Sequence, residues 1–183
     1  MASIKARRAI PPLDRKRLDE LALRYVGRYA TTRAKLRSYL ARKLRERGWS
    51  EPSAPDLEAL GQRFAELGYI DDAAFALSKS QALAARGFGK RRLLDKLRLA
   101  GVEDEDAAAA RDHADAEALE AALRFAGRRR IGPFAATAPD PRQREKWIAA
   151  LVRAGHAFAL ARAIVELPPG AAVDRDDLRE RAR

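Results

Sequence analysis

Apolar side chains recur every three or four residues along almost the whole chain. The spacing is clearest in three stretches, at Leu18, Leu21, Ala22, Tyr25 and Tyr29, then at Leu36, Tyr39, Leu40 and Leu44, then at Leu57, Leu60, Phe64 and Leu67. Because an α-helix turns once in about 3.6 residues, this spacing places the apolar groups on one face of a helix. No convincing stretch alternates between apolar and polar residues, as a half-buried strand does. The pattern predicts an all-α protein.

The ends of the predicted helices carry residues that stop and start helices. A glycine follows four of the periodic runs, where a left-handed cap favours it, at Gly48, Gly68, Gly101 and Gly155. Thr32, Asp71 and Asp140 stand at helix starts, and Pro141 follows at a first helical position. These signals predict helices over about residues 14–28, 32–46, 55–67, 72–86, 89–100, 103–112, 115–129, 141–154 and 156–167.

One pattern of residues occurs three times. Leu40, Leu44, Gly48 and Trp49 align with Leu93, Leu97, Gly101 and Val102, and these align in turn with Trp147, Leu151, Gly155 and His156. Each copy holds a large apolar residue, a second one four positions later, and a glycine four positions after that. A unit of three short helices has little core of its own, so neighbouring units must pack end to end. We therefore expect three tandem three-helix repeats that form an elongated, curved molecule.

The repeats divide the chain into five segments. We expect a flexible basic tail over residues 1–12, repeats over 13–68, 69–113 and 114–170, and a charged C-terminal tail over 171–183. Two segments depart from the common layout: the basic, Pro-containing insertion at 127–141 and the acidic, Ala-rich stretch at 103–120.

Positive charge is concentrated in the first quarter of the chain. The formal net charge is +11, and residues 1–50 account for all of it, because acids and bases balance over the remainder. Such a localised excess favours attraction to a polyanion or to an acidic protein surface. An alternative is that the abundant Arg reflects the codon usage of a GC-rich genome. That alternative does not explain why acids are scarce in one segment.

Little in the sequence points to catalysis. His113 and His156 have no metal-ligand spacing and no serine partner, and Asp71 and Asp72 lie where carboxylates cap a helix. The segment 87–90, Gly-Phe-Gly-Lys, lacks the spacing of a phosphate-binding loop. We expect no catalytic residues, no metal and no cofactor.

The chain has no cysteine, and no apolar run is long enough for a signal peptide or a spanning helix. We therefore expect a soluble, cytoplasmic protein without a membrane contact.

Helical geometry suggests which cations face a partner. Arg17, Arg24 and Arg28 form a stripe on the first helix, and Lys35, Arg42 and Arg45 lie opposite the inward-facing Leu40 on the second. Lys90, Arg91 and Arg98 are available in the same way in the second repeat. These nine residues are the predicted partner-binding face.

Three segments resemble a known family. The stretch 67–76, Leu-Gly-Tyr-Ile-Asp-Asp-Ala-Ala-Phe-Ala, is followed by Arg-Gly-Phe-Gly-Lys-Arg-Arg-Leu at 86–93 and by Leu-Arg-Leu-Ala-Gly-Val at 97–102. Together they resemble the signature of the RecX family of regulatory proteins. The earlier Tyr-Ala-Thr-Thr-Arg at 29–33, with its spaced leucines, Lys43, Gly48 and Trp49, is similar to the first-repeat pattern of that family. The resemblance covers about residues 18–130.

The resemblance implies a function. RecX proteins bind the RecA recombinase filament on single-stranded DNA and hinder its growth, strand exchange and co-protease function. The family has no catalytic residues to carry over. We accordingly expect a monomer that binds this filament, with weak direct DNA binding through the basic first repeat.

The alternative function is non-specific DNA binding by three-helix modules. The chain has no Asn, and Gln62, Gln81 and Gln143 are scattered, so reading of base edges is disfavoured while phosphate binding stays open.

Overall fold

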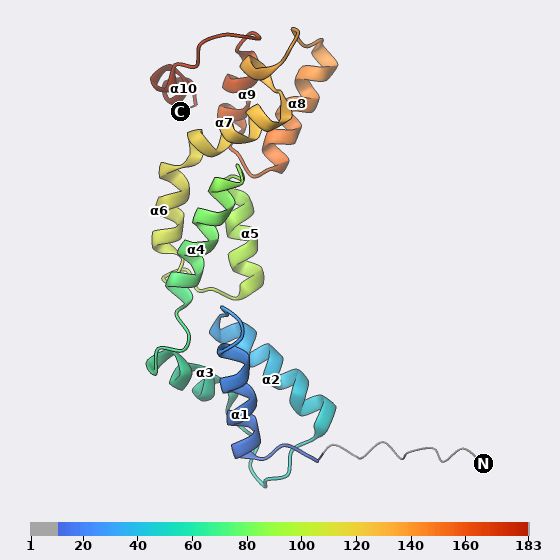
Figure 1. Cartoon of the computed structure of the whole chain (residues 1–183), viewed down its shortest axis with the longest axis vertical. Coiled ribbons are helices and arrows are strands. Elements are labelled where there is room, and N and C mark those ends of the chain that lie inside the picture. The colour runs from blue at the N-terminus through green and yellow to red at the C-terminus, as the bar shows by residue number, and fades with distance from the viewer. Residues whose placement is uncertain (1–10, 183) are drawn as a thin grey trace, which may run out of the picture. The chain divides into compact units, whose positions relative to one another are not determined.

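The computed structural model describes residues 11–182, whose regular structure is helical. Residues 1–10, which make up most of the predicted basic tail, lie outside the described residues. The prediction of an all-α fold is confirmed. The helices are α1 (Arg15–Val26), α2 (Arg33–Arg47), α3 (Leu57–Glu66), α4 (Asp72–Ala85), α5 (Lys90–Ala100), α6 (Ala108–Ala116), α7 (Ala118–Arg129), the 3-10 turn η1 (Gly132–Phe134), α8 (Pro141–Arg153), α9 (Phe158–Glu166) and α10 (Arg175–Arg181) (Figure 1).

The chain divides into two compact units. The N-terminal unit runs to Asp71, and the C-terminal unit begins at Asp72. Buried apolar side chains form one cluster in the N-terminal unit and two clusters in the C-terminal unit. Each cluster is built mainly by three consecutive helices, with α10 added to the last.

The N-terminal unit packs α1, α2 and α3 around one core. Its buried apolar residues are Leu13, Leu18, Ala22, Leu36, Leu40, Leu60, Phe64 and Ile70. As predicted, Thr32 caps α2: its hydroxyl accepts a hydrogen bond from the Lys35 amide at 3.1 Å. The segment before α1 is tied to the end of α2, because the Leu13 amide donates to the Gly48 carbonyl at 3.0 Å. These contacts fix α1 beside α2.

The C-terminal unit contains two cores. The first lies between α4, α5 and α6, where Ala76, Ala110 and Ala114 are small enough for α4 and α6 to pack closely. The second lies between α7, α8, α9 and α10.

The two cores of the C-terminal unit meet at a crossing of two turns, where the Gly89 amide donates to the Ala154 carbonyl at 3.0 Å. A Cβ at Gly89 would lie 2.3 Å from the Gly155 carbonyl oxygen, so the crossing requires glycine.

Several of the aligned positions of the repeat have similar environments. Leu40 and Leu93 are both buried, and so are Leu97 and Leu151. The three aligned glycines all adopt a positive φ, of 79° at Gly48, 66° at Gly101 and 99° at Gly155. Leu44 and Trp147, which align with these leucines, are only partly buried. The three tandem repeats therefore stay a prediction.

Two helices differ from the prediction. The predicted helix at 103–112 is observed at Ala108–Ala116, because the acidic residues before it form a turn in which the Ala107 amide donates to the Glu103 carbonyl. The predicted tail 171–183 contains α10, whose Leu178 is fully buried in the last core. Asp174 caps α10 by accepting from the amides of Asp176 and Asp177.

Candidate functional site

A shallow cavity of about 480 Å³ lies where the end of α1 meets the middle of α2 in the N-terminal unit. We call it the tyrosine cavity, and its lining residues are Arg24, Tyr25, Arg28, Tyr29, Tyr39, Arg42 and Lys43. The lining thus consists of aromatic rings and cations. Its volume falls within the range of about 300–1,000 Å³ that is usual for ligand sites.

The three tyrosines form a connected aromatic cluster. The rings of Tyr25 and Tyr39 stack with their centroids 4.3 Å apart and their planes 14° from parallel. Tyr29 lies 5.4 Å from Tyr25 at an angle of 53°. The turn after α1 sets this arrangement, because the amides of Arg28 and Tyr29 both donate to the Tyr25 carbonyl. The Tyr29 side chain stays about half exposed at the surface.

Cations lie beside these rings. The Arg28 guanidinium is 6.0 Å from the Tyr29 centroid, and Arg42 and the Lys43 ammonium lie 5.7 and 5.9 Å from the Tyr39 centroid. These distances permit cation–π attraction. Among the described residues, Arg24 and Arg28 have no acidic partner. The cavity is therefore electropositive and presents both charge and flat aromatic surface.

One carboxylate moderates the charge of the tyrosine cavity. Glu46 accepts a hydrogen bond from the Lys43 ammonium at 2.6 Å and lies 3.7 Å from the Arg42 side chain. The hydrogen bond from Lys43 and the nearby positive charges hold the pKa of Glu46 below its ordinary value. Glu46 is thus ionised near neutral pH and offsets part of the positive charge.

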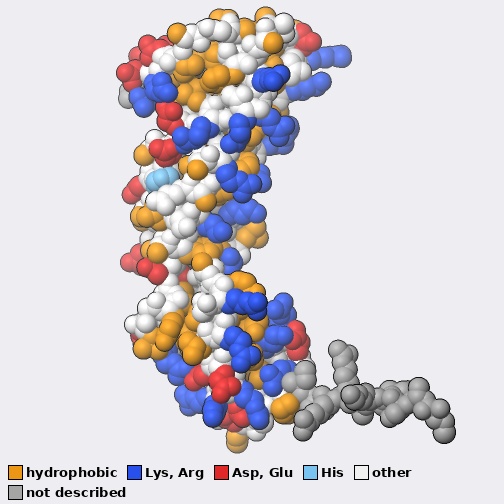
Figure 2. Space-filling model, viewed as in Figure 1, with side chains coloured by type: hydrophobic (Ala, Val, Ile, Leu, Met, Phe, Trp, Pro, Cys, Tyr) orange, Lys and Arg blue, Asp and Glu red, His pale blue; other side chains and the backbone are white. Residues whose placement is uncertain are grey.

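The C-terminal unit carries a second basic recess, of about 270 Å³. We call it the arginine recess, and it is lined by Arg91, Arg92, Asp95, Val152, Arg153 and Gly155. The turn crossing positions these cations, because the Arg91 amide donates to the Gly155 carbonyl at 3.2 Å. Figure 2 shows Lys and Arg side chains along the α5 side of this unit, whereas Asp and Glu gather toward α6.

The structure brings together some of the predicted binding residues of the N-terminal unit and separates others. Arg24, Arg28 and Arg42 meet at the tyrosine cavity. Arg17 instead lies in an ion pair with Asp14 at 3.1 Å, at the other end of α1. Lys35 is half-buried in the first turn of α2, and Arg45 is exposed near its end, and neither lines the cavity.

The predicted residues of the C-terminal unit also separate. Arg91 lines the arginine recess. The Lys90 ammonium pairs with Asp115 at 2.5 Å, and the Arg98 guanidinium lies 3.5 Å from Asp95. An ion pair at the surface reduces the charge that a side chain offers to a partner.

Sequence reasoning did not place six residues of these two surfaces in the binding face. They are Tyr25, Tyr29, Tyr39 and Lys43 at the tyrosine cavity, and Arg92 and Arg153 at the arginine recess. From the sequence, the spacing of the tyrosines was used only to predict helices. Interleaving of aromatic and basic residues was the signal that could have identified the cavity.

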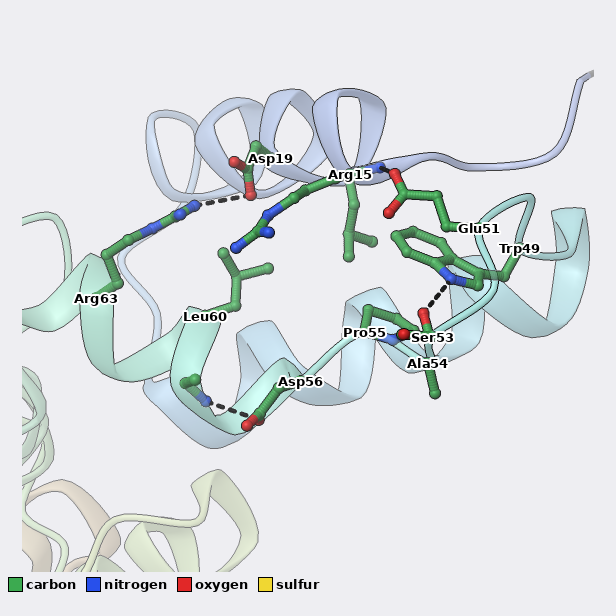
Figure 3. Close-up of a pocket in the computed structure, with 12 residues that line it drawn as sticks. Arg15, Asp19, Trp49, Glu51, Ser53, Ala54, Pro55, Asp56, Leu60 and Arg63 are labelled. Carbon is green, nitrogen blue, oxygen red and sulfur yellow. Dashed lines mark hydrogen bonds and ion pairs between the residues drawn. The ribbon is translucent and has the colours of Figure 1, made fainter.

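A third cavity, of about 380 Å³, is lined mainly by residues that bind one another within the N-terminal unit (Figure 3). The Arg63 guanidinium pairs with Asp19 at 2.7 Å, and the Trp49 indole N–H donates to the Ser53 carbonyl at 2.7 Å. Asp56 accepts from the Ala59 amide and so caps α3. Most polar groups of this cavity are thus hydrogen-bonded or ion-paired within the chain. Acidic and basic side chains both line it, so it has no strong charge of one sign.

The two histidines hold helices together. The buried Ser80 hydroxyl donates to the Ala110 carbonyl at 2.9 Å, which leaves its oxygen to accept from the Nδ1–H of His113 at 3.0 Å. Since Ser80 is only 1% exposed and its proton is engaged, this pair links α4 to α6 and does not form a nucleophile. His156 is buried, with Nε2 3.1 Å from the Gly87 carbonyl. Burial lowers the pKa of His156.

Metal-binding clusters and membrane-spanning helices are both absent from residues 11–182. No group of three or more His, Asp or Glu side chains there is arranged to hold a metal ion. None of the helices in that range is long and apolar enough to cross a membrane.

Relatives with similar sequences identify the family. No protein-family model matches the chain. The chain is 35% identical to regulatory protein RecX of Myxococcus xanthus over 164 residues, which cover 83% of this chain and 86% of the relative. It is 32% identical to regulatory protein RecX of Thermobifida fusca, over 81% of this chain and 77% of the relative. It is 30% identical to that of Agrobacterium fabrum, over 78% of each. With this similarity along most of its length, the chain belongs to the RecX family of regulatory proteins.

Proposed function

We propose that the chain regulates the RecA recombinase by binding its filament on single-stranded DNA and inhibiting filament growth, strand exchange and co-protease function. The protein acts by binding, as a monomer, and catalyses no reaction. The observation that carries this proposal is the electropositive surface of the N-terminal unit, where Arg24 and Arg28 lack acidic partners among the described residues beside exposed aromatic surface. Membership in a family of regulatory proteins supports it.

The charge of the protein suits a filament on single-stranded DNA. A DNA-bound protein filament presents phosphates and acidic side chains over a long surface, and a localised positive field speeds encounter with such a target. The tyrosine cavity and the arginine recess lie in different units. Two linked weak contacts bind more tightly than either one alone when both can engage. The proposal also includes contact with more than one RecA subunit, as the resemblance to RecX proteins implies.

The second candidate function is non-specific DNA binding without RecA. The aromatic rings of the tyrosine cavity favour it, because such rings stack on unpaired bases. In that case the protein would bind naked single strands as tightly as it binds RecA-coated strands. Under the proposed function, direct DNA binding is a weak addition through the basic first repeat.

A titration distinguishes the two candidates. Fluorescently labelled protein is added to single-stranded DNA, either naked or coated with RecA, at one salt concentration. We expect much tighter binding to the coated strand, since specific protein contacts supplement the sequence-independent attraction to phosphate. Equal affinities would support plain DNA binding and contradict the proposal. A double variant, Arg91→Gln with Arg153→Gln, tests whether the C-terminal unit contributes to binding of the coated strand.

A further inference from the structure

We propose that the tyrosine cavity is a binding site for single-stranded nucleic acid, in which unstacked bases lie on the tyrosine rings and backbone phosphates contact the surrounding cations. The site consists of the cluster Tyr25, Tyr29 and Tyr39 with Arg24, Arg28, Arg42 and Lys43. The inference rests on the proposed function, in which the protein binds a RecA filament on single-stranded DNA. It assigns the DNA strand, and not the RecA subunits, to this cavity.

The aromatic geometry favours bases over a simple anion. Tyr25 and Tyr39 stack on one another, and Tyr29 leans against Tyr25 with about half of its surface exposed. A phosphate ion or a carboxylate needs cations alone, and gains nothing from three adjoining rings. Every base has a flat π face, so an exposed ring beside guanidinium groups is a suitable platform for unpaired bases.

The charges favour a backbone with repeated phosphates. Four cations line the cavity, and Glu46 is the acid that pairs with two of them. Arg24 and Arg28 lie on the α1 side, while Arg42 and Lys43 lie on α2, so positive charge flanks the tyrosine cluster on both sides. A strand whose base rests on the rings can therefore place phosphates on either side.

The lining also indicates the selectivity of the site. The lining contains no Asn or Gln side chain to read adenine and no Asp or Glu to accept from cytosine, so its cations could contact only guanine edges. Stacking uses the flat face that every base has, and we therefore expect binding to depend little on sequence. In a duplex the base faces are already stacked and cannot reach the rings, so a single strand is preferred.

The test measures binding of short oligothymidylate to the full-length protein in the absence of RecA. Tyr29→Leu keeps an apolar side chain but removes the π face, and we expect it to weaken binding roughly tenfold without changing the salt dependence. Arg28→Gln should weaken binding and also lower the slope of log affinity against log salt by about 0.7, as expected for one lost phosphate contact. Glu46→Gln should strengthen binding, because it removes the opposing charge.

The chain offers matched controls for the tyrosine and arginine changes. Tyr69 is 53% exposed, as Tyr29 is, and its ring leans on Phe64 at 5.6 Å, but it lies outside the tyrosine cavity. Tyr69→Leu should therefore leave oligothymidylate binding unchanged. Lys16 is an exposed cation of α1 that does not line the cavity, so Lys16→Gln controls for the loss of one charge.

Three results would overturn the inference. They are unchanged oligothymidylate binding by Tyr29→Leu, equal affinity for duplex DNA, and binding of polyglutamate as tight as that of oligothymidylate, which would indicate an acidic protein partner. None of them bears on RecA regulation, which is measured separately on RecA-coated DNA. A failure of the proposed function would in turn leave the difference between Tyr29→Leu and Tyr69→Leu intact.

Discussion

His156 is a buried imidazole that joins two turns of the C-terminal unit. Its Nε2–H donates to the Gly87 carbonyl, and its ring lies 5.9 Å from that of Phe125. Because burial disfavours the charged form, the folded protein takes up a proton at His156 less readily than the unfolded chain does. Neutral His156 therefore stabilises the fold, and its protonation opposes folding.

This burial predicts a pH dependence of stability. The pKa of His156 is lowered from its ordinary value of 6.5, so the unfolded state binds more protons once the pH falls below that value. The free energy of unfolding should decrease as the pH falls through about 6.5, by at most about 1.4 kcal/mol per pH unit. The contribution of His156 is fully present above the unfolded pKa. Urea unfolding at a series of pH values measures it.

The variant His156→Gln isolates this contribution. A glutamine amide can donate to the same carbonyl but does not titrate in this range. The variant should therefore lose less stability on acidification than the wild-type protein, because the two proteins differ only at this residue. If the two proteins lost stability in parallel, titration of His156 would not be linked to folding.

Residue identities alone did not reveal which cations are available. Lys90 and Arg91 are neighbours in the sequence, yet Lys90 pairs with Asp115 whereas Arg91 lines the arginine recess. The partner of Lys90 lies 25 residues away on another helix. Helical periodicity predicts the face on which a side chain lies, but not the acid that a neighbouring helix brings to it.

In the C-terminal unit, the packing of α5 against the turn after α8 depends on a close approach of their backbones. The turn after α8 crosses the start of α5, and Gly155 at this crossing has a φ of 99°. A Cβ there would lie 2.6 Å from the Arg92 amide nitrogen. Substitution at Gly155 would therefore strain the turn and also push α5 away from it.

We expect Gly155→Ala to reduce the free energy of unfolding by more than about 2 kcal/mol. Gly170→Ala is the matched control, because Gly170 also has a positive φ, of 75°, while a Cβ there would meet no atom within 4 Å. Gly170→Ala should reduce the free energy of unfolding only by the backbone strain, about 1 kcal/mol. Urea unfolding midpoints compare the two variants. Equal losses would show that the crossing tolerates a side chain.

At the scale of elements, apolar spacing predicted most helices and their cores. Leu40, Leu93 and Leu151 are buried as their spacing indicated. It failed where short-range polar contacts decide a boundary, as in the acidic turn before α6. It also missed α10, whose single core residue Leu178 is too little to produce a periodic pattern.

The tyrosine cavity could be predicted only in part. The spacing of Tyr25 and Tyr29 predicts that they share one face of the first helix, although α1 ends at Val26 and Tyr29 lies in the turn after it. Tyr39 belongs to the apolar pattern of the second helix. Stacking of Tyr25 on Tyr39 depends on how α1 and α2 pack, which the spacing within each helix does not determine. Arg24, Arg28 and Arg42 belong to the predicted binding face, whereas the rings beside them enter the sequence analysis only through their helical spacing.

At the scale of the whole molecule, function is proposed to arise from binding surfaces on a fold of small helical modules. The cations lie at the surface, where they are exposed or partly exposed, while the core clusters consist of apolar residues. Substitution of exposed cations should therefore separate binding from folding. Arg24 and Arg28 are suited to this purpose, because both are exposed and neither has an acidic partner among the described residues.

The most direct test of the account is the rate of ATP hydrolysis by RecA on single-stranded DNA, measured with and without this protein. The account predicts a lower rate with the protein present at a concentration equal to that of RecA. It also predicts weaker inhibition by the double variant Arg24→Gln with Arg28→Gln, whose unfolding midpoint should stay close to that of the wild-type protein. An unchanged rate of hydrolysis in the presence of the folded wild-type protein would contradict the account.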